Sequence, residues 1–179
     1  CSLSAYGADG PIGGRPAYDH VVQAMSGIME TTGTDEMGPV KVGAPYVDYA
    51  TGLNAAFAVM AALAERTRTG EGQVVDVSML DTTLNLMASN MSAVATTGND
   101  LPKLGNEAAS GSPSSGCFTT GDGEHIMLAA NNERQFADLC KGLGHPEWSS
   151  DERWSGPTVR RQNQAELRDL MAEAFASDS

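Results

Sequence analysis

The chain has 179 residues and a clear excess of acidic over basic side chains. It contains 23 Asp and Glu against 11 Lys and Arg, which gives a net charge of −12 and a pI near 4.4. A phosphate-bearing partner must then be held by local basic groups rather than by a global positive field, so nucleic acid is not expected as a partner. With 41% hydrophobic residues, the chain is long enough for one domain with a real core or for pieces of two.

The number and spacing of cysteines and the hydropathy pattern indicate the cellular compartment in which we expect the protein. The three cysteines, Cys1, Cys117 and Cys140, are an odd number without CxxC spacing, which argues against a disulfide framework and a zinc site. The three histidines are also scattered, so no bound metal is expected. In our interpretation no apolar run approaches the roughly 18 residues needed to span a bilayer, and the start lacks a signal-peptide pattern. The sequence therefore predicts a cytoplasmic protein with no membrane partner.

The first third of the sequence predicts a strand, a glycine-rich loop and a helix. "CSLSAYG" (1–7) has a strand-like pattern and leads into "GADGPIGGRP" (7–16), a turn-rich loop of the kind that binds ligands at strand ends in α/β proteins. Apolar residues at helical spacing then predict an amphipathic helix over 17–33, with Asp19 as its cap and Gly33 as its stop.

The next segments predict helix, strand and helix. Residues 48–70 are rich in Ala, Leu and Met and end in Arg66, Arg68 and Gly70, so we expect a long helix that is apolar on nearly every face and hence buried. The pattern of 72–80 indicates a strand. Residues 81–96 indicate a further helix with Asp81 as its cap.

Composition changes near residue 97. Residues 98–116 are dominated by Gly, Ser, Pro, Asn and Ala without periodicity, which indicates a linker or a mobile functional loop. Two β-like runs around Asp122 and Gly123 then predict a hairpin, and helical patterns follow over 133–144 and in the tail from Asp151. We therefore expect an α/β protein with a large-domain part over 1–97 and the start of a smaller α/β domain over 117–179.

Asp48 is the single acid at the head of the long predicted helix, and no other acid occurs before Glu65. It has two compatible interpretations. A carboxylate at this position can accept hydrogen bonds from free N–H groups and interact with the positive end of the helix dipole, as an ordinary cap does. An ionised carboxylate there is also what covalent catalysis at an acyl carbon needs.

Long blocks of this sequence resemble the family III CoA-transferases, named after carnitine and bile-acid CoA-transferases. The resemblance is carried by "SAYGADGPIGGRPAYDHVVQAMSGIMETTG", by "VKVGAPYVDYATGLNAAFAVMAALAERTRTGEGQVVDVSMLD" and by "GCFTTGDGEHIMLAANNERQFADLCKGLGHPEW". Within the second block, "RTGEGQVVDVSMLD" is the most specific part. The resemblance implies a Rossmann-like large domain followed by a small domain, and it implies that Asp48, at the start of the helix after the "VG" loop, is the catalytic group.

The resemblance also implies a reaction and its partners. It implies transfer of CoA from an acyl-CoA to a carboxylic acid through an aspartyl anhydride and an aspartyl-CoA thioester, with CoA thioesters as substrates and no separate cofactor. It further implies an interlocked homodimer. Because the chain begins at Cys1 without Met and ends as a helical pattern is completing, we interpret it as an internal fragment. An inactive fragment or subunit of the same fold is therefore an alternative.

A second alternative is 2-methylacyl-CoA racemase, a relative within the same fold family. Those enzymes carry "HD" where this chain has Tyr18 and Asp19, and their His removes the proton next to the thioester carbonyl. Tyr18 is a poor base, because a phenol has an ordinary pKa of about 10. His20 lies two residues on, and we expect it to point to another helix face. We therefore expect Tyr18 and Asp19 to bind substrate, although packing of Tyr18 on the helix stays open.

The resemblance extends to the loop and to one cation. The segment "EAASGSPSSG" lies where the family has a mobile, often glycine-rich loop over the active site, which places Gly111 and Ser112 in the expected substrate- and CoA-binding set. An ordinary linker is the alternative there. Arg15, at the mouth of the first loop, is expected either to bind a CoA phosphate or to be a solvated surface cation.

Overall fold

The computed structural model describes residues 1–177 and divides into two compact units, Cys1–Lys103 and Leu104–Ser179. The division falls inside the segment 98–116 that the sequence marks as a linker. Each unit mixes helices with a small sheet, which confirms the α/β class.

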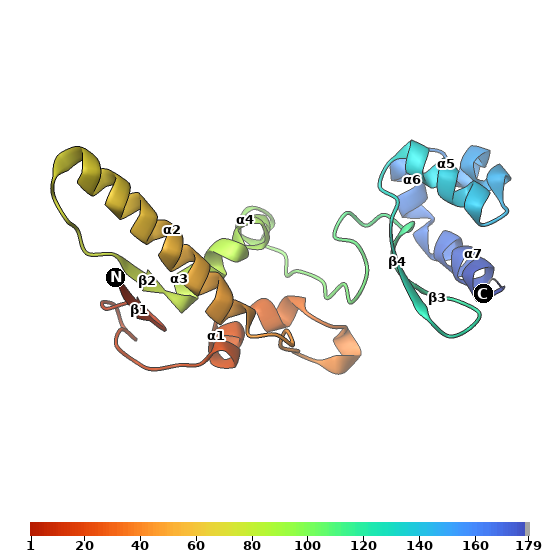
Figure 1. The fold of residues 1–179 in the computed structure, drawn as a ribbon. Helices are drawn as coiled ribbons and strands as arrows, with labels where there is room; N and C mark the ends of the chain where they lie inside the picture. Colours follow the sequence, from red (N-terminus) through yellow and green to blue (C-terminus); the bar gives the residue numbers. More distant parts are fainter. Residues whose placement is uncertain (178–179) are drawn as a thin grey trace. The chain divides into compact units, whose positions relative to one another are not determined.

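The first unit places two parallel strands beside a set of helices (Figure 1). Its elements are β1 (Ser2–Ser4), α1 (Asp19–Met25), η1 (Ile28–Thr31), η2 (Asp35–Met37), α2 (Tyr46–Thr69), β2 (Asp76–Ser78), α3 (Met79–Leu86) and α4 (Ala88–Thr97). Leu3 of β1 lies opposite Val77 of β2. Parallel neighbours need a long crossover, and the chain from α1 to α2 supplies it. Within residues 1–177 this sheet has only these two strands, so a full Rossmann-like sheet stays an expectation.

Two predicted helix boundaries differ from the structure. α1 ends at Met25 because Gly27 adopts a left-handed conformation with φ 85°, so Gly33 does not stop it. The helix expected over 81–96 begins at Met79 and breaks at Met87 into α3 and α4. Its cap is Ser78, whose hydroxyl accepts the Asp81 N–H at 3.0 Å, and the prediction that Asp81 is the cap was wrong.

Helix α2 has the predicted extent but not the predicted burial. It runs from Tyr46 to Thr69 and ends at Gly70, whose φ of 79° is left-handed. Its buried residues are Val47, Thr51 and Ala55, whereas Leu53 and Phe57 are 74% and 75% exposed. The expectation that α2 is buried on nearly every face was wrong. An apolar composition does not bury a helix by itself, because each face must also pack against a neighbouring element. Within unit 1, the main contacts of α2 are with α1, β2 and α3.

By length and composition alone, α2 could cross a membrane. An 18-residue window within it has a mean hydropathy of 1.3, and 11% of that window is buried. The interpretation that no apolar segment approaches this length was wrong, because Ala and Gly between the larger side chains extend the apolar stretch without forming an obvious run. Core helices of globular proteins have the same composition, so this finding carries no conclusion about a membrane.

The packed end of α2 is its beginning. A buried cluster joins the end of β1, α1, the first turn of α2 and the start of α3, and its members are Ala5, Val22, Val47 and Met79. Val22 and Val47 are fully buried there. The first turn of α2 is therefore fixed, while much of the rest of the helix surface is exposed.

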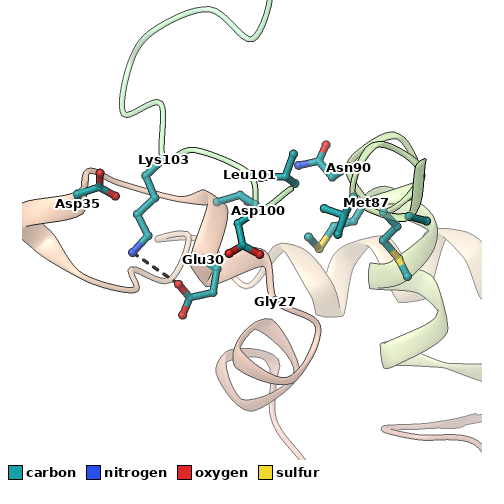
Figure 2. Close-up of a pocket in the computed structure, with 12 residues that line it drawn as sticks. Gly27, Glu30, Asp35, Met87, Asn90, Asp100, Leu101 and Lys103 are labelled. Atoms are coloured by element: carbon teal, nitrogen blue, oxygen red, sulfur yellow. Dashed lines mark ion pairs between the residues drawn. The ribbon is translucent and has the colours of Figure 1, made fainter. Parts of the chain in front are cut away.

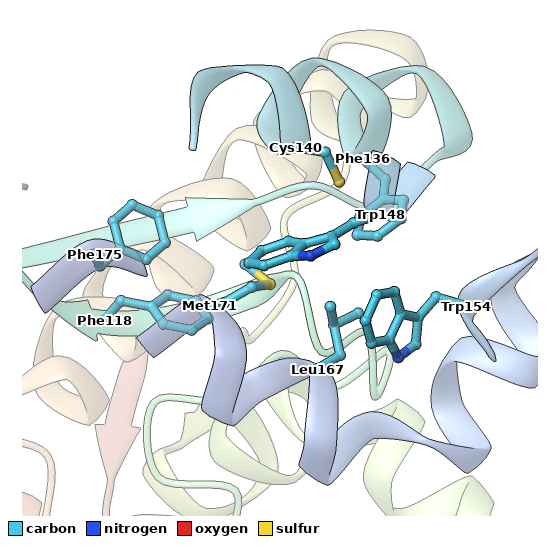
Figure 3. Close-up of a cluster of buried hydrophobic side chains, with 8 residues drawn as sticks. All are labelled: Phe118, Phe136, Cys140, Trp148, Trp154, Leu167, Met171 and Phe175. Atoms are coloured by element: carbon cyan, nitrogen blue, oxygen red, sulfur yellow. The ribbon is translucent and has the colours of Figure 1, made fainter. Parts of the chain in front are cut away.

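The second unit is a hairpin packed on helices. Its elements are β3 (Ser115–Thr119), β4 (His125–Ala129), α5 (Glu133–Gly142), η3 (Pro146–Ser150), η4 (Glu152–Trp154), α6 (Pro157–Gln162) and α7 (Gln164–Ser177). β3 and β4 pair antiparallel, with Cys117 opposite Met127, which confirms the predicted hairpin. Figure 3 shows the core, in which eight side chains from the hairpin, α5, the 3-10 turns and α7 gather: Phe118, Phe136, Cys140, Trp148, Trp154, Leu167, Met171 and Phe175.

Candidate active site at the start of helix α2

Asp48 lies in the first turn of α2 with its side chain exposed. This confirms that it opens the long helix. Across residues 1–177 its carboxylate forms no ion pair and accepts no hydrogen bond, although its backbone N–H is a donor. Pro45, the residue before the helix, has no side chain that can cap it. The interpretation of Asp48 as the ordinary cap of its own helix was therefore wrong.

The cap comes from Asp19, a residue of another helix. Asp19 Oδ2 accepts the N–H of Val47 at 2.8 Å and the N–H of Asp48 at 3.2 Å. Asp19 is 9% exposed, and it does not cap α1, whose preceding residue makes no side-chain capping bond. The sequence correctly marked Asp19 as a helix cap but assigned it to the wrong helix. Its expected contact with substrate stays a prediction.

Gln23 extends this capping network, and the sequence reasoning missed it. Its Nε2 donates to Asp19 Oδ1, and its Oε1 accepts the N–H of Val42 at 2.8 Å. Gln23 is fully buried. The signal was available, because an amide four residues after Asp19 lies on the same helix face and beside the buried Val22.

Tyr46, the first residue of α2, lies beside Asp19. Its hydroxyl is buried and has no hydrogen-bond partner within the described part of the chain. Burial, and to a smaller extent the negative charge of Asp19, raise the pKa of the Tyr46 phenol above its ordinary value. The phenol is therefore neutral at physiological pH and does not add a charge next to Asp48.

Tyr18 and His20 lie together on the surface near the start of α1. Tyr18 is 76% exposed, so the alternative that it packs on the helix was wrong. The two rings are parallel with their centroids 6.3 Å apart. The expectation that His20 faces away from Tyr18 was also wrong, because Tyr18 precedes the first helical turn and its extended backbone turns the side chain toward His20. Contact of Tyr18 with substrate stays a prediction.

Arg15 lies at the end of the glycine-rich loop, shortly before α1. This loop is tight: the Gly14 N–H donates to the Gly7 carbonyl at 3.2 Å, and a Cβ on Gly13 would lie 2.8 Å from the Ala8 carbonyl oxygen. Arg15 is exposed and lines a cavity of about 340 Å³ beside the end of β1 and the start of α3. Such a position at the carboxyl end of a strand is typical of ligand-binding loops in α/β proteins.

Gly111 and Ser112 belong to the second unit. The Gly111 N–H donates to the Ala108 carbonyl at 2.9 Å, and the Ser112 hydroxyl donates to the Ala130 carbonyl at 3.2 Å. The Arg161 guanidinium donates to the Ser110 carbonyl at 3.1 Å. The loop is thus held by the residue that follows β4 and by α6, and a role of Gly111 and Ser112 in binding substrate stays a prediction.

A larger cavity of unit 1 has the wrong charge for phosphate. It measures about 620 Å³ and lies between η1, α4 and residues 100–103 (Figure 2). Glu30, Asp35 and Asp100 are among its lining residues, and the one cation there, Lys103, pairs with Glu30 at 3.7 Å. A CoA phosphate would meet net negative charge at this cavity, so it does not compete with the start of α2 as the candidate site.

The chain belongs to CoA-transferase family III, because the model of that family matches residues 1–179. It is 34% identical over 178 residues to succinyl-CoA:glutarate CoA-transferase of Mus musculus, covering 99% of this chain and 40% of that protein. It is 33% identical over 176 residues to acetyl-CoA:oxalate CoA-transferase of Acetobacter aceti, covering 98% of this chain and 45% of that protein.

Solved structures agree with this assignment. A CAIB/BAIF family protein from Brucella suis is 31% identical and superposes with a TM-score of 0.81, covering 98% of this chain and 46% of the other. A protein from Mycobacterium tuberculosis is 33% identical with a TM-score of 0.83, covering 99% and 46%. These matches confirm the family and the fold class. The chain spans less than half the length of these relatives.

Proposed function

We propose that the protein containing this chain transfers CoA from an acyl-CoA to a carboxylic acid, with Asp48 as the nucleophile. The observation that carries the proposal is the state of Asp48: it lies in the first turn of α2 with an exposed carboxylate, while Asp19 does the capping. Membership of the family and the names of its relatives support transfer chemistry.

The proposed reaction proceeds through two covalent intermediates. The Asp48 carboxylate attacks the thioester carbonyl, the C–S bond breaks, and a mixed anhydride and CoA thiolate form. The thiolate attacks the aspartyl carbonyl and releases the donor acid, which leaves an aspartyl-CoA thioester. The acceptor carboxylate then attacks this thioester to form a second anhydride, and the released thiolate takes the acceptor acyl group and restores Asp48. One thioester replaces another, so neither ATP nor a separate cofactor is required.

The environment of Asp48 suits this chemistry in three ways. Its carboxylate has no competing partner among residues 1–177, so attack breaks no ion pair. The start of α2 contributes the positive end of a helix dipole, which stabilises the oxyanions that form at the attacked carbonyls. The Tyr46 phenol is neutral and adds no further negative charge. We assign Arg15, in the cavity beside β1, to a CoA phosphate, and Tyr18, Gly111 and Ser112 to the substrate-binding set. Both carboxylate oxygens of Asp19 accept hydrogen bonds within unit 1, so we assign Asp19 to the cap of α2 rather than to substrate.

The names of the relatives suggest the acids to test first. Succinyl-CoA with glutarate and acetyl-CoA with oxalate are the pairs that two of them carry. The intact protein is incubated with each acyl-CoA and digested, and mass spectrometry is used to look for CoA mass on the peptide that contains Asp48. The proposal predicts this adduct, its loss on addition of an acceptor acid, and its absence in Asp48→Asn. A transferring Asp48→Asn enzyme would contradict the mechanism.

We also propose that the intact protein is a homodimer, in which each chain threads through the other. An interlocked pair cannot exchange subunits without unfolding, so mixing tagged and untagged dimers at native pH should give no mixed species over hours. Elution as a compact monomer at micromolar concentration would contradict this part of the proposal.

A further inference from the structure

The buried side chains of Asp19 and Gln23 hold the first turn of α2, which contains Asp48. The first N–H groups of a helix have no partner within the helix and need an acceptor from elsewhere. The residue before α2 is Pro45, which offers neither a capping side chain nor an N–H. The acceptor is instead Asp19 Oδ2, at 2.8 Å from the Val47 nitrogen and 3.2 Å from the Asp48 nitrogen.

This arrangement removes the local partners that Asp48 would otherwise have. An acid in the third position of a helix commonly turns back to the N–H of the residue before the helix, as in a capping box. That partner is missing here, because Pro45 has no N–H. The next candidates, the N–H groups of Val47 and Asp48, are taken by Asp19. The Asp48 carboxylate is therefore left outside the cap and points to solvent.

Gln23 makes the network rigid. It is fully buried, and both ends of its amide are used: Nε2 donates to Asp19 Oδ1, and Oε1 accepts the Val42 N–H at 2.8 Å. The amide thus ties the loop before α2 to the same carboxylate that caps the helix. A buried amide whose donors and acceptors are matched in this way has one preferred orientation.

We propose that Asp19 and Gln23 are positioning residues, which fix the first turn of α2 and keep the Asp48 carboxylate free to attack a thioester. This inference rests on the proposed role of Asp48 as the nucleophile. Neither residue needs to contact substrate to act in this way. A displacement of about 1 Å at a reacting group can lower a rate on the order of 100-fold. The hydrogen bonds of Asp19 and Gln23 can therefore affect the reaction rate through the position of Asp48, without any contact with substrate.

The test uses two single variants of the intact protein and their combination. Asp19→Asn turns an NH₂ group toward the Gln23 donor or the helix N–H groups, and Gln23→Glu sets an acceptor of like charge against Asp19. The double variant Asp19→Asn with Gln23→Glu restores every donor–acceptor pair, with the donor now on residue 19. Three quantities are measured: the rate of CoA adduct formation on Asp48, the KM for the acyl-CoA, and hydrogen exchange at the Val47 and Asp48 amides.

We expect each single variant to form the adduct about 100-fold more slowly with a KM within about threefold of wild type, and the double variant to recover to within about tenfold. Exchange at the two amides should be at least about tenfold faster in the single variants and restored in the double one. Single variants that react at the wild-type rate, or a double variant that does not recover, would overturn the inference. If wild type forms no adduct, the proposed function fails, and amide exchange alone then decides whether the pair holds the helix start.

Discussion

Two aspartates, Asp19 and Asp48, lie at the start of α2 although they are 29 positions apart in the chain. Asp19 is buried and accepts two backbone N–H groups, whereas Asp48 is exposed and its carboxylate has no partner in residues 1–177. The difference follows from position: Asp19 faces the helix end from another element, and Asp48 lies within the first turn. The cap of α2 and the carboxylate that is unpaired among the described residues are therefore supplied by two different residues.

The first prediction uses this separation. Asp48→Asn removes only the interaction of a charge with the helix dipole, so it should lower the free energy of unfolding by less than about 1 kcal/mol. Asp19→Ala leaves the buried Val47 N–H and the part-buried Asp48 N–H without their acceptor and should lower it by about 1–3 kcal/mol. Chemical denaturation of both variants checks the order. An Asp48→Asn protein that is the less stable of the two would contradict the capping assignment.

The second prediction concerns Tyr18 and His20, whose rings lie side by side. If the protein is a transferase, deuterium from heavy water should not enter the α-position of a bound acyl-CoA at rates that match turnover. Tyr18→Phe and His20→Gln should then leave CoA transfer within about tenfold of wild type, because neither side chain serves as an obligatory base. Exchange that matches turnover and is lost in His20→Gln would favour the racemase alternative.

The third prediction follows from the buried thiol of Cys140. Burial raises the pKa of this thiol from its ordinary value to about 11. Between pH 9 and 11 the unfolded chain then releases the proton while the folded chain keeps it, so stability falls as pH rises, by at most about 1.4 kcal/mol per pH unit. Cys140→Ala should lose this part of the slope. Equal slopes for wild type and Cys140→Ala in alkaline denaturation would contradict the prediction.

At the scale of elements, the sequence predicted where helices occur better than which elements pack against them. The composition of 48–70 correctly indicated a long helix ending at Gly70, because these are local properties of the chain. Its burial depends on which elements come to lie beside it, and the pattern alone does not contain that information. The same reason explains Asp19: a capping residue was recognisable, but the helix it caps lies 27 residues further along the chain and is reached only by folding.

The fourth prediction tests how α2 ends. Gly70 has a φ of 79°, and a Cβ added there would meet no atom within 4 Å, so Gly70→Ala introduces backbone strain without a clash. We expect it to lower the free energy of unfolding by about 1–2 kcal/mol. Gly72 has equally open space but no left-handed φ, which makes Gly72→Ala the matched control. The control should be neutral or stabilise by up to about 1 kcal/mol, since alanine restricts the unfolded chain. A similar loss in the free energy of unfolding for Gly70→Ala and Gly72→Ala would contradict a left-handed conformation of Gly70 at the end of α2.

At the scale of the whole molecule, each of the two units has its own core, and the candidate site draws on unit 1. The small cluster around Val22 and Val47 fixes the start of α2. The aromatic cluster of unit 2 packs against the hairpin, and hydrogen bonds from Ser112 and Arg161 hold the loop at Gly111. The place of Asp48 in the first turn of a long helix was predictable from local composition, and its catalytic role stays a proposal. The contact of Gln23 with Asp19 could have been read from their helical spacing, whereas the link from Gln23 to Val42 could not, because it arises only when α1 and the loop at Val42 come together.

The last prediction concerns unit 2 as a cooperative whole. Its core combines β3, α5, the 3-10 turns and α7, and Leu167 of α7 is fully buried within it. Leu167→Ala should lower the free energy of unfolding of this unit by about 2–5 kcal/mol, through lost transfer energy and the cavity left behind. Met127→Ala, at a position that is 63% exposed on β4, should change it by less than about 0.5 kcal/mol. Because the elements share one cluster, hydrogen exchange in Leu167→Ala should accelerate together at the amides of β3, α5 and α7. Acceleration confined to α7 would show that these elements do not depend on a common core.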